Sequence, residues 1–261
     1  MGISVTGRVH DYNQPNGGFI NPKELTRTLY EDGWVLAEEN IHPSLVGTVV
    51  DYMTRVTLGV SVGEAFSLSI LGMCAAGKVD MAEELLNRIT GLNEESIHAA
   101  CMLANYGQAA RVNVRDVYPD TATINNIEIM VNRSMTFFDI AGEPVLTGFT
   151  FEPEGCTEKE FLTMADQCGG YTSTVSSGDG DYLMNNSLWD FKVSKNEPTS
   201  KHTLQLLMYW RMGIHSGRKE YQNIETIGIF NPRLNAAYAY KTSDVLQEII
   251  NVVDKEVIGY K

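Results

Sequence analysis

Apolar residues in the first half of the chain recur at the spacing of amphipathic helices. Stripes at i, i+3, i+4 run through residues 45–58, 63–76, 81–89 and 97–106, and a further helix is expected at about 123–138. Asp80 and Asn93 are each expected to cap the helix that follows, because their side chains can satisfy free N–H groups. We therefore expect residues 22–138 to be mostly helical.

The second half of the chain has a mixed pattern. Strands are expected at 145–151, 171–176, 182–184, 188–193, 226–230 and 236–240, and helices at about 200–212 and 243–257. Residues 157–160, Thr-Glu-Lys-Glu, fit a capping box that opens another short helix. This order predicts an α/β fold, with a mixed central sheet flanked by helices and a large N-terminal helical region.

The domain organisation expected from the chain is simple. Residues 1–21, with Asn, Gln, Pro and Gly between 13 and 18, are expected to form a flexible N-terminal arm. Residues 22–261 are expected to form a single domain, since this length can bury one full core. We expect a cytoplasmic protein without membrane contact, because no apolar run is long enough to span a bilayer.

Composition and charge restrict the function. Apolar residues make up 43% and charged residues 20% of the chain, as in ordinary globular proteins. The four cysteines lack the Cys-x-x-Cys spacing of a zinc site. The net charge of −13 opposes binding to nucleic acid, whose affinity comes largely from Lys and Arg. A nucleic-acid site on this protein would therefore need a locally basic cleft.

Residues 177–193 are expected to form a hairpin that carries the chemistry. Its second arm alternates, so that Leu188, Asp190 and Lys192 share one face and the residues between them share the other. Buried ions cost several kcal/mol, which favours a functional use for both charges. Asp181 begins the preceding arm and could pair beside Asp190, giving two carboxylates that suit Mg²⁺ or Mn²⁺. The alternative is a salt-bridged edge strand, with Asp179 and Asp181 as turn residues.

The helix that follows the hairpin adds two polar residues. Gln205 and Tyr209 are four residues apart, so they share one helical face and could both reach toward the strand. The alternative is a half-buried amphipathic helix with a tyrosine in the core.

Taken in order, Gly-x-x-Asp (178–181), Asp-x-Lys (190–192) and Gln-x-x-x-Tyr (205–209) resemble the signature of the PD-(D/E)XK nuclease superfamily. Within it, the chain resembles the RecB-like exonucleases and the CRISPR-associated and phage nucleases. The resemblance implies a restriction-endonuclease-like fold and metal-dependent hydrolysis of phosphodiester bonds in DNA. Asp181 and Asp190 would bind Mg²⁺ or Mn²⁺, Lys192 would assist the attacking water, and Gln205 and Tyr209 would support them. Gly-Asp replaces the literal Pro-Asp pair, and Asp179 would be the ligand if the register were shifted.

The family also carries an acidic residue or a histidine on an earlier helix. Asp51 is the candidate for this third metal ligand, and Arg55, one turn later, is a candidate phosphate contact, although a surface ion pair explains the same spacing. Lys195 and Lys201 lie beyond the catalytic strand, where they could bind a nucleic-acid backbone. The helical segment at about 61–138 lies outside the minimal core and is expected to be an insertion.

The expected partner is DNA, single-stranded or at double-stranded ends. The alternative function keeps the fold without catalysis, as a protein- or nucleic-acid-binding module whose acidic surface engages a basic partner. A homo-oligomer is compatible with either function.

Overall fold

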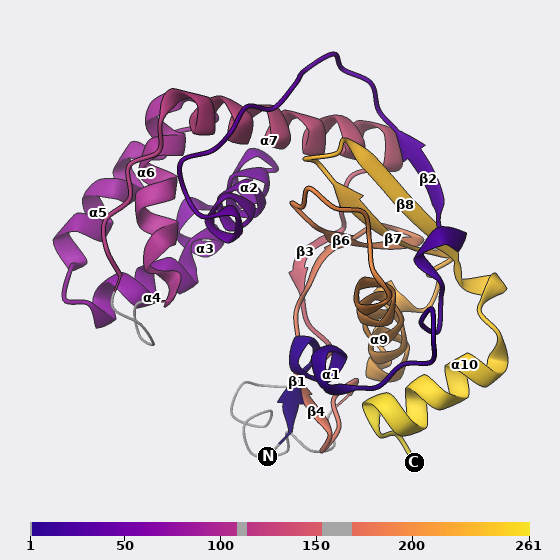
Figure 1. Cartoon of the computed structure of the whole chain (residues 1–261). Helices are drawn as coiled ribbons and strands as arrows, with labels where there is room; N and C mark the ends of the chain where they lie inside the picture. Colours follow the sequence, from indigo (N-terminus) through magenta and orange to yellow (C-terminus); the bar gives the residue numbers. More distant parts are fainter. Residues whose placement is uncertain (1, 109–113, 153–168) are drawn as a thin grey trace.

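The computed structural model describes residues 2–108, 114–152 and 169–261. The chain forms a helical lobe and a sheet lobe, and the long helix α7 (Thr121–Ala141) runs from one to the other (Figure 1). The helical lobe also contains α2 (Pro43–Thr57), α3 (Val62–Ala65), α4 (Ser67–Ala75), α5 (Val79–Arg88) and α6 (Glu94–Ala104). These helices bury their apolar stripes in one core that includes Val49, Phe66 and Ile127. The predicted Asn93 cap is confirmed, because Asn93 accepts a hydrogen bond from the Ser96 N–H. The predicted Asp80 cap is wrong, because Asp80 lies inside the first turn of α5 and Lys78 precedes that helix.

The sheet lobe is built on six strands in the order β2-β8-β7-β6-β5-β3. The strands are β2 (Thr26–Leu29), β3 (Leu146–Phe149), β5 (Gly180–Leu183), β6 (Ser187–Phe191), β7 (Thr226–Asn231) and β8 (Ala236–Lys241). The neighbours β6 and β7 are parallel and the other pairs are antiparallel. A mixed sheet flanked by helices was expected, and the structure confirms it at that level.

Helices cover both faces of the sheet, as the alternation along β6 predicts. Leu188 lies in the core beneath α9 (Ser200–Ser216). Trp189 and Phe191 lie in a separate aromatic cluster with Phe137 and Phe138 of α7. Phe137 is 4.8 Å from Trp189 and Phe138 is 5.4 Å from Phe191, measured between ring centroids. The two faces of one strand therefore serve two different cores.

The first residues differ from the flexible arm expected for 1–21. Ile3–Ser4 form β1, paired with β4 (Val175–Ser177), and Val5–Asp11 form α1. Val5 and Val9 are buried in the core shared with α9. The Arg8 guanidinium donates to the carbonyl oxygens of Glu256 and Val257. These long-range contacts hold the segment in place, and a local pattern of polar residues does not reveal them.

Two other elements also differ from the prediction. The strand β2 lies within the region expected to be helical; all four of its residues are exposed at the sheet edge, so no alternation marks it. The closing helix is shorter, with α10 at Gln247–Val252 followed by a π-helical segment at Val253–Ile258. The capping box at 157–160 lies outside the described residues. None of the helices in the described ranges is long and apolar enough to cross a membrane.

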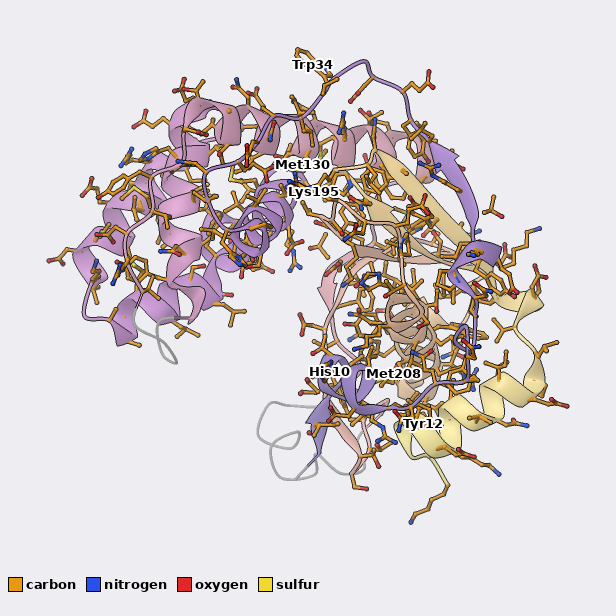
Figure 2. The ribbon with its side chains drawn as sticks, in the orientation of Figure 1. His10, Tyr12, Trp34, Met130, Lys195 and Met208 are labelled. Carbon is orange, nitrogen blue, oxygen red and sulfur yellow. The ribbon has the colours of Figure 1, made fainter. Side chains whose placement is uncertain are left out.

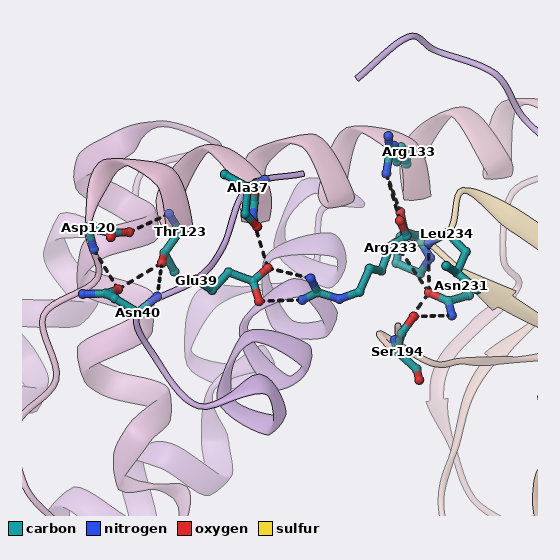
Figure 3. Close-up of polar contacts among 12 residues, drawn as sticks. Ala37, Glu39, Asn40, Asp120, Thr123, Arg133, Ser194, Asn231, Arg233 and Leu234 are labelled. Carbon is teal, nitrogen blue, oxygen red and sulfur yellow. Dashed lines mark hydrogen bonds and ion pairs between the residues drawn. The ribbon is translucent and has the colours of Figure 1, made fainter. Parts of the chain in front are cut away.

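Residues 30–41 cross α7 on their way from β2 to α2, and polar contacts hold this segment down (Figures 1 and 3). Asn40 accepts hydrogen bonds from the N–H of Asp120 and the hydroxyl of Thr123. Glu39 forms a two-pronged ion pair with Arg233, with N–O distances of 2.8 and 2.9 Å, and both side chains are almost fully buried. The crossing segment thereby joins the two lobes.

Candidate active site at the β5–β6 hairpin

The hairpin places two aspartates opposite each other on one face of the sheet. Leu183 of β5 faces Leu188 of β6 in an antiparallel register. Two residues further along each strand, the same register sets Asp181 opposite Asp190. Side chains two residues apart share a face, and both leucines lie in the core beneath α9. Both carboxylates therefore point to the side of the sheet that α9 covers.

Asp190 is 2% exposed and is paired with Lys192. The Lys192 Nζ lies 3.1 Å from Oδ1 and 2.8 Å from Oδ2 of this carboxylate. Oδ2 is buried and, beyond this ion pair, accepts no hydrogen bond of normal geometry within the described residues. Burial alone would lower the pKa of Lys192, but the negative charges of Asp190 and Asp181 reverse the effect and raise it. Lys192 therefore stays charged beside Asp190.

Asp181 is in a less favourable environment for a negative charge. Its Oδ2 accepts a 2.7 Å hydrogen bond from the backbone N–H of Phe191, which fixes the side chain across the hairpin. Burial, then the charges of Asp190 and Asp51, raise its pKa well above the ordinary value, while Lys192 opposes the rise. A carboxyl of this kind retains a proton to higher pH, or is neutralised by a nearby cation.

On α2, Asp51 and Arg55 form an ion pair beside the hairpin. The Arg55 Nη2 lies 2.9 Å from Asp51 Oδ2 and 3.9 Å from Asp181 Oδ1. The Tyr182 hydroxyl donates to Asp51 Oδ1 over 3.2 Å. A glycine permits this approach: a Cβ on Gly148, whose φ is +64°, would lie 2.5 Å from Arg55 Nη1. The structure therefore brings the predicted residues of α2 to the site.

Asp51 was predicted to be a third metal ligand, and its partners in the structure bear on that role. Burial raises the pKa of Asp51, and the charge of Arg55 opposes the rise. Across the three described ranges, no group of three or more His, Cys, Asp or Glu side chains is arranged to hold a metal ion. Asp51 is instead bound by Arg55 and Tyr182, so the pair of carboxylates that face each other is Asp181 and Asp190. Neither Tyr182 nor the approach of Arg55 to Asp181 was predicted from the sequence.

The predicted polar pair on α9 lies inside the protein. The Gln205 Nε2 donates to the Tyr209 hydroxyl oxygen over 2.7 Å, and both side chains are buried. Burial, then the charge of Asp190, raises the pKa of Tyr209. Tyr209 also stacks on Phe151 at 5.5 Å between ring centroids. The charge of Asp190 therefore reaches Tyr209, and the Gln205–Tyr209 pair is also buried in the interior of the protein.

The predicted basic residues Lys195 and Lys201 lie in different surroundings. Lys195 is exposed in the loop after β6, and Lys201 lies on the first turn of α9. The Lys201 Nζ is 3.1 Å from the His10 Nδ1 of α1, whereas Figure 2 shows Lys195 well apart from His10. His202 is nearer the carboxylates: burial and the charge of Lys192 lower its pKa, and Asp190 opposes them. Sequence alone missed His10 because α1 was expected to be flexible.

The alternative ligand Asp179 and a cavity beside α7 both lie outside the pair of opposed carboxylates. Asp179 is exposed in the turn before β5, whereas Asp181 lies on the strand opposite Asp190, so the register favours Asp181. A cavity of about 680 Å³ lies between residues 30–37 and α7 and is lined in part by Trp34, Asn126 and Arg133. It contains none of the hairpin residues. The opposed charges lie on the hairpin, which is therefore the candidate active site.

Comparison with known proteins adds no relative, since no family model, no curated protein and no solved structure matches the chain.

Proposed function

We propose that the chain is a divalent-metal-dependent nuclease of the PD-(D/E)XK type, with a restriction-endonuclease-like sheet and DNA as its substrate. One observation carries the proposal: Asp181 and Asp190 face each other across a buried hairpin, with Lys192 on the same strand face as Asp190. Like charges set directly opposite destabilise a sheet. A protein that keeps two such carboxylates, one with a raised pKa, has a use for them.

The residues fit a hard divalent cation. Mg²⁺ and Mn²⁺ prefer carboxylate oxygens and are commonly held by one or two carboxylates plus water and phosphate oxygens. The buried Oδ2 of Asp190 has a free acceptor position, and the pKa of Asp181 is raised by burial and then by the charges of Asp190 and Asp51, both of which a bound cation would offset. When bound, the ion would polarise the phosphate and lower the pKa of a water molecule. Asp181 and Asp190 would hold it.

The other residues have roles that follow from their contacts. Lys192 keeps its charge beside Asp190 and would orient the attacking water or stabilise negative charge that develops on the phosphate. Gln205 and Tyr209, which are hydrogen-bonded to each other on α9, would support the carboxylates of the hairpin. Arg55 carries a positive charge toward Asp181 and would contact a phosphate. Lys195 and Lys201 would bind the backbone of the nucleic acid, where the net charge is otherwise unfavourable.

The direct test is cleavage of labelled single- and double-stranded DNA with Mg²⁺ or Mn²⁺. We expect Asp190→Asn and Lys192→Gln to lower the rate at least about a hundredfold. The control for Asp190→Asn is Asp254→Asn, because the Asp254 carboxylate pairs with Arg211 of α9 away from the hairpin. The control for Lys192→Gln is Lys241→Gln at the end of β8. Both controls should cleave at close to the wild-type rate.

The alternative is a catalytically inactive module that binds protein or nucleic acid. One observation favours it: Arg55 and Lys192 already partner the three acids, as a structural ion network would. Calorimetry with Mn²⁺ separates the two functions. A nuclease must bind Mn²⁺, and Asp190→Asn should remove that binding. Binding of DNA without metal uptake and without cleavage would refute the nuclease and favour the module.

A further inference from the structure

The cavity between the crossing segment and α7 is built into the fold. Its volume of about 680 Å³ is within the range of ligand pockets in proteins. At one end of its outer wall, Arg133 of α7 donates to the Asp32 carboxylate and to the Trp34 carbonyl. At the other end, the Asn126 side chain accepts from the Ala37 N–H and donates to the Ala37 carbonyl. Both ends of the wall are therefore tied to α7.

One stripe of α7 forms the floor of this cavity. Its members recur every three or four residues, so they share one face of the helix. They are Ala122, Asn125, Ile129, Asn132 and Thr136. At 1.5 Å per residue, the stripe extends about 21 Å along the helix axis. A floor of this length, partly polar and partly apolar, suits an elongated ligand that has both kinds of group.

The positive charge in the cavity is already used by the protein. Among the described residues that line the cavity, Arg133 is the one base. A guanidinium has five N–H donors, and this one makes five hydrogen bonds: two to the Asp32 carboxylate and one each to the carbonyls of Trp34, Pro232 and Arg233. An anion in the cavity would therefore find no unused donor on Arg133.

Negative charge in the cavity is left uncompensated. Glu31 and Glu128 line it, and neither forms an ion pair or a hydrogen bond with any other described residue. Glu128 is only partly exposed. The side-chain amides of Asn125 and Asn132 are also unpaired within the described residues, and their oxygens can accept hydrogen bonds. The polar groups that remain for a ligand are therefore mainly acceptors, and two of them are charged.

An exposed aromatic side chain lies beside these acceptors. Trp34 lines the cavity and is 65% exposed, and the adjacent Val35 is 90% exposed. Figure 2 shows Trp34 at the outer edge of the molecule, on the crossing segment. The face of an indole attracts cations more strongly than other aromatic rings do. Trp34, Val35 and Ile129 also offer apolar surface to the methylene groups of a ligand.

We propose that this cavity binds a linear alkylammonium ion, with ammonium groups on Glu31 and Glu128 and methylene groups against Trp34 and Ile129. The inference goes beyond the proposed nuclease activity and does not depend on it. The same chemistry is found in a free aliphatic polyamine and in the lysine side chain of another protein, so the experiment compares these two sources.

Isothermal titration calorimetry of the full chain at 0.15 M NaCl, without DNA or metal, tests the site. The probes are spermidine and a short peptide with two lysines and blocked ends. We expect saturable binding at one site, and no binding of inorganic phosphate. Tighter binding of spermidine would identify a free polyamine as the ligand, and tighter binding of the peptide would identify a protein side chain. Binding of neither probe would overturn the proposal.

A pair of neutralised carboxylates separates this site from general attraction to an acidic surface. Glu128→Gln and the control Glu83→Gln on α5 each remove one negative charge, and Glu83 is exposed. We expect Glu128→Gln to weaken spermidine binding at least about tenfold, because a charge-assisted hydrogen bond is lost. Glu83→Gln should bind as the wild type does, and Glu31→Gln should repeat the loss without a change in α7. Equal effects of Glu128→Gln and Glu83→Gln would overturn the proposal.

Tryptophan fluorescence reports occupancy of the cavity directly. Trp189 and Trp210 are 6% and 8% exposed, so a ligand at the surface changes mainly the emission of Trp34. We expect saturating spermidine to shift the emission of the wild type, and Trp34→Leu to abolish the shift while circular dichroism stays unchanged. An emission spectrum that does not change, or a shift that persists in Trp34→Leu, would overturn the contact with Trp34.

Discussion

Replacing Asp181 with asparagine is expected to stabilise the protein in the absence of metal. The change removes one of two opposed carboxylates, and the amide oxygen of asparagine can still accept the hydrogen bond from Phe191. Side chains that face each other in an antiparallel pair have Cβ atoms about 5 Å apart. At that separation and an effective dielectric constant of about 20, two negative charges repel by about 3 kcal/mol. Lys192 offsets part of this repulsion, so we expect a gain of about 1–2 kcal/mol in the free energy of unfolding.

The gain should depend on pH in a defined direction. Because the pKa of Asp181 is raised in the folded state, the folded protein keeps this proton at a pH where the unfolded chain has lost it. Wild-type stability therefore includes a contribution that is complete below about pH 4 and is lost as the pH rises through the folded-state pKa. Asparagine does not titrate, so the advantage of the variant should increase with pH.

Urea denaturation at several pH values in a chelating buffer measures this difference, and thermal unfolding should show a rise in Tm of about 2–8 °C near neutral pH. Under the proposed function, Mn²⁺ should stabilise the wild type but not Asp181→Asn. Adding Mn²⁺ should therefore reduce the difference between their free energies of unfolding. A variant less stable than the wild type at neutral pH, or a difference independent of pH, would show that the pKa of Asp181 is not raised in the folded protein.

Three further changes test other parts of the structure. Arg233→Ala leaves the buried Glu39 carboxylate unpaired and should cost about 3–5 kcal/mol in urea unfolding; if Glu39→Gln in the same protein recovers none of this, the ion pair is not the cause. Gly72→Ala places a Cβ against the backbone of Tyr106 and should cost at least about 3 kcal/mol, and a loss below about 1 kcal/mol would show that the helices separate easily. His202 Nδ1 accepts the N–H of the N-cap residue of α9, and because its pKa is lowered, wild-type stability should fall as the pH drops below about 6.5. His202→Asn should flatten that dependence by about 0.5–1 kcal/mol between pH 7 and 5, and an unchanged slope would assign it to other groups.

The sheet face of β6 is where sequence reasoning succeeded best. Alternation with period two predicted that Asp190 and Lys192 share a face with Leu188 and oppose Trp189, and this is how the strand is buried. The pattern was readable because both faces of this central strand are covered, so every position is under a strong constraint. At the sheet edge the constraint is absent, and β2 was missed because none of its side chains is buried.

The candidate site was predicted in part for the same reason. Local spacing shows which residues of a hairpin or a helix share a face, and this brought Asp181 to Asp190 and Gln205 to Tyr209. It does not show which distant elements meet. The approach of Arg55 to Asp181 depends on the missing side chain of Gly148 on another strand, and sequence spacing contains no information on that contact.

The contacts of α1 with the end of the chain have a consequence for how the protein folds as it is made. Arg8 and Val257, joined by a hydrogen bond, are 249 residues apart. At about 5–20 residues per second, a ribosome takes about 12–50 s to synthesise that interval. During this time Val5 and Val9 are without the C-terminal part of the core that later covers them. The core around α1 is therefore completed only after residue 257 has been made, through contacts of high sequence separation, and Val5 and Val9 are exposed to other proteins until then.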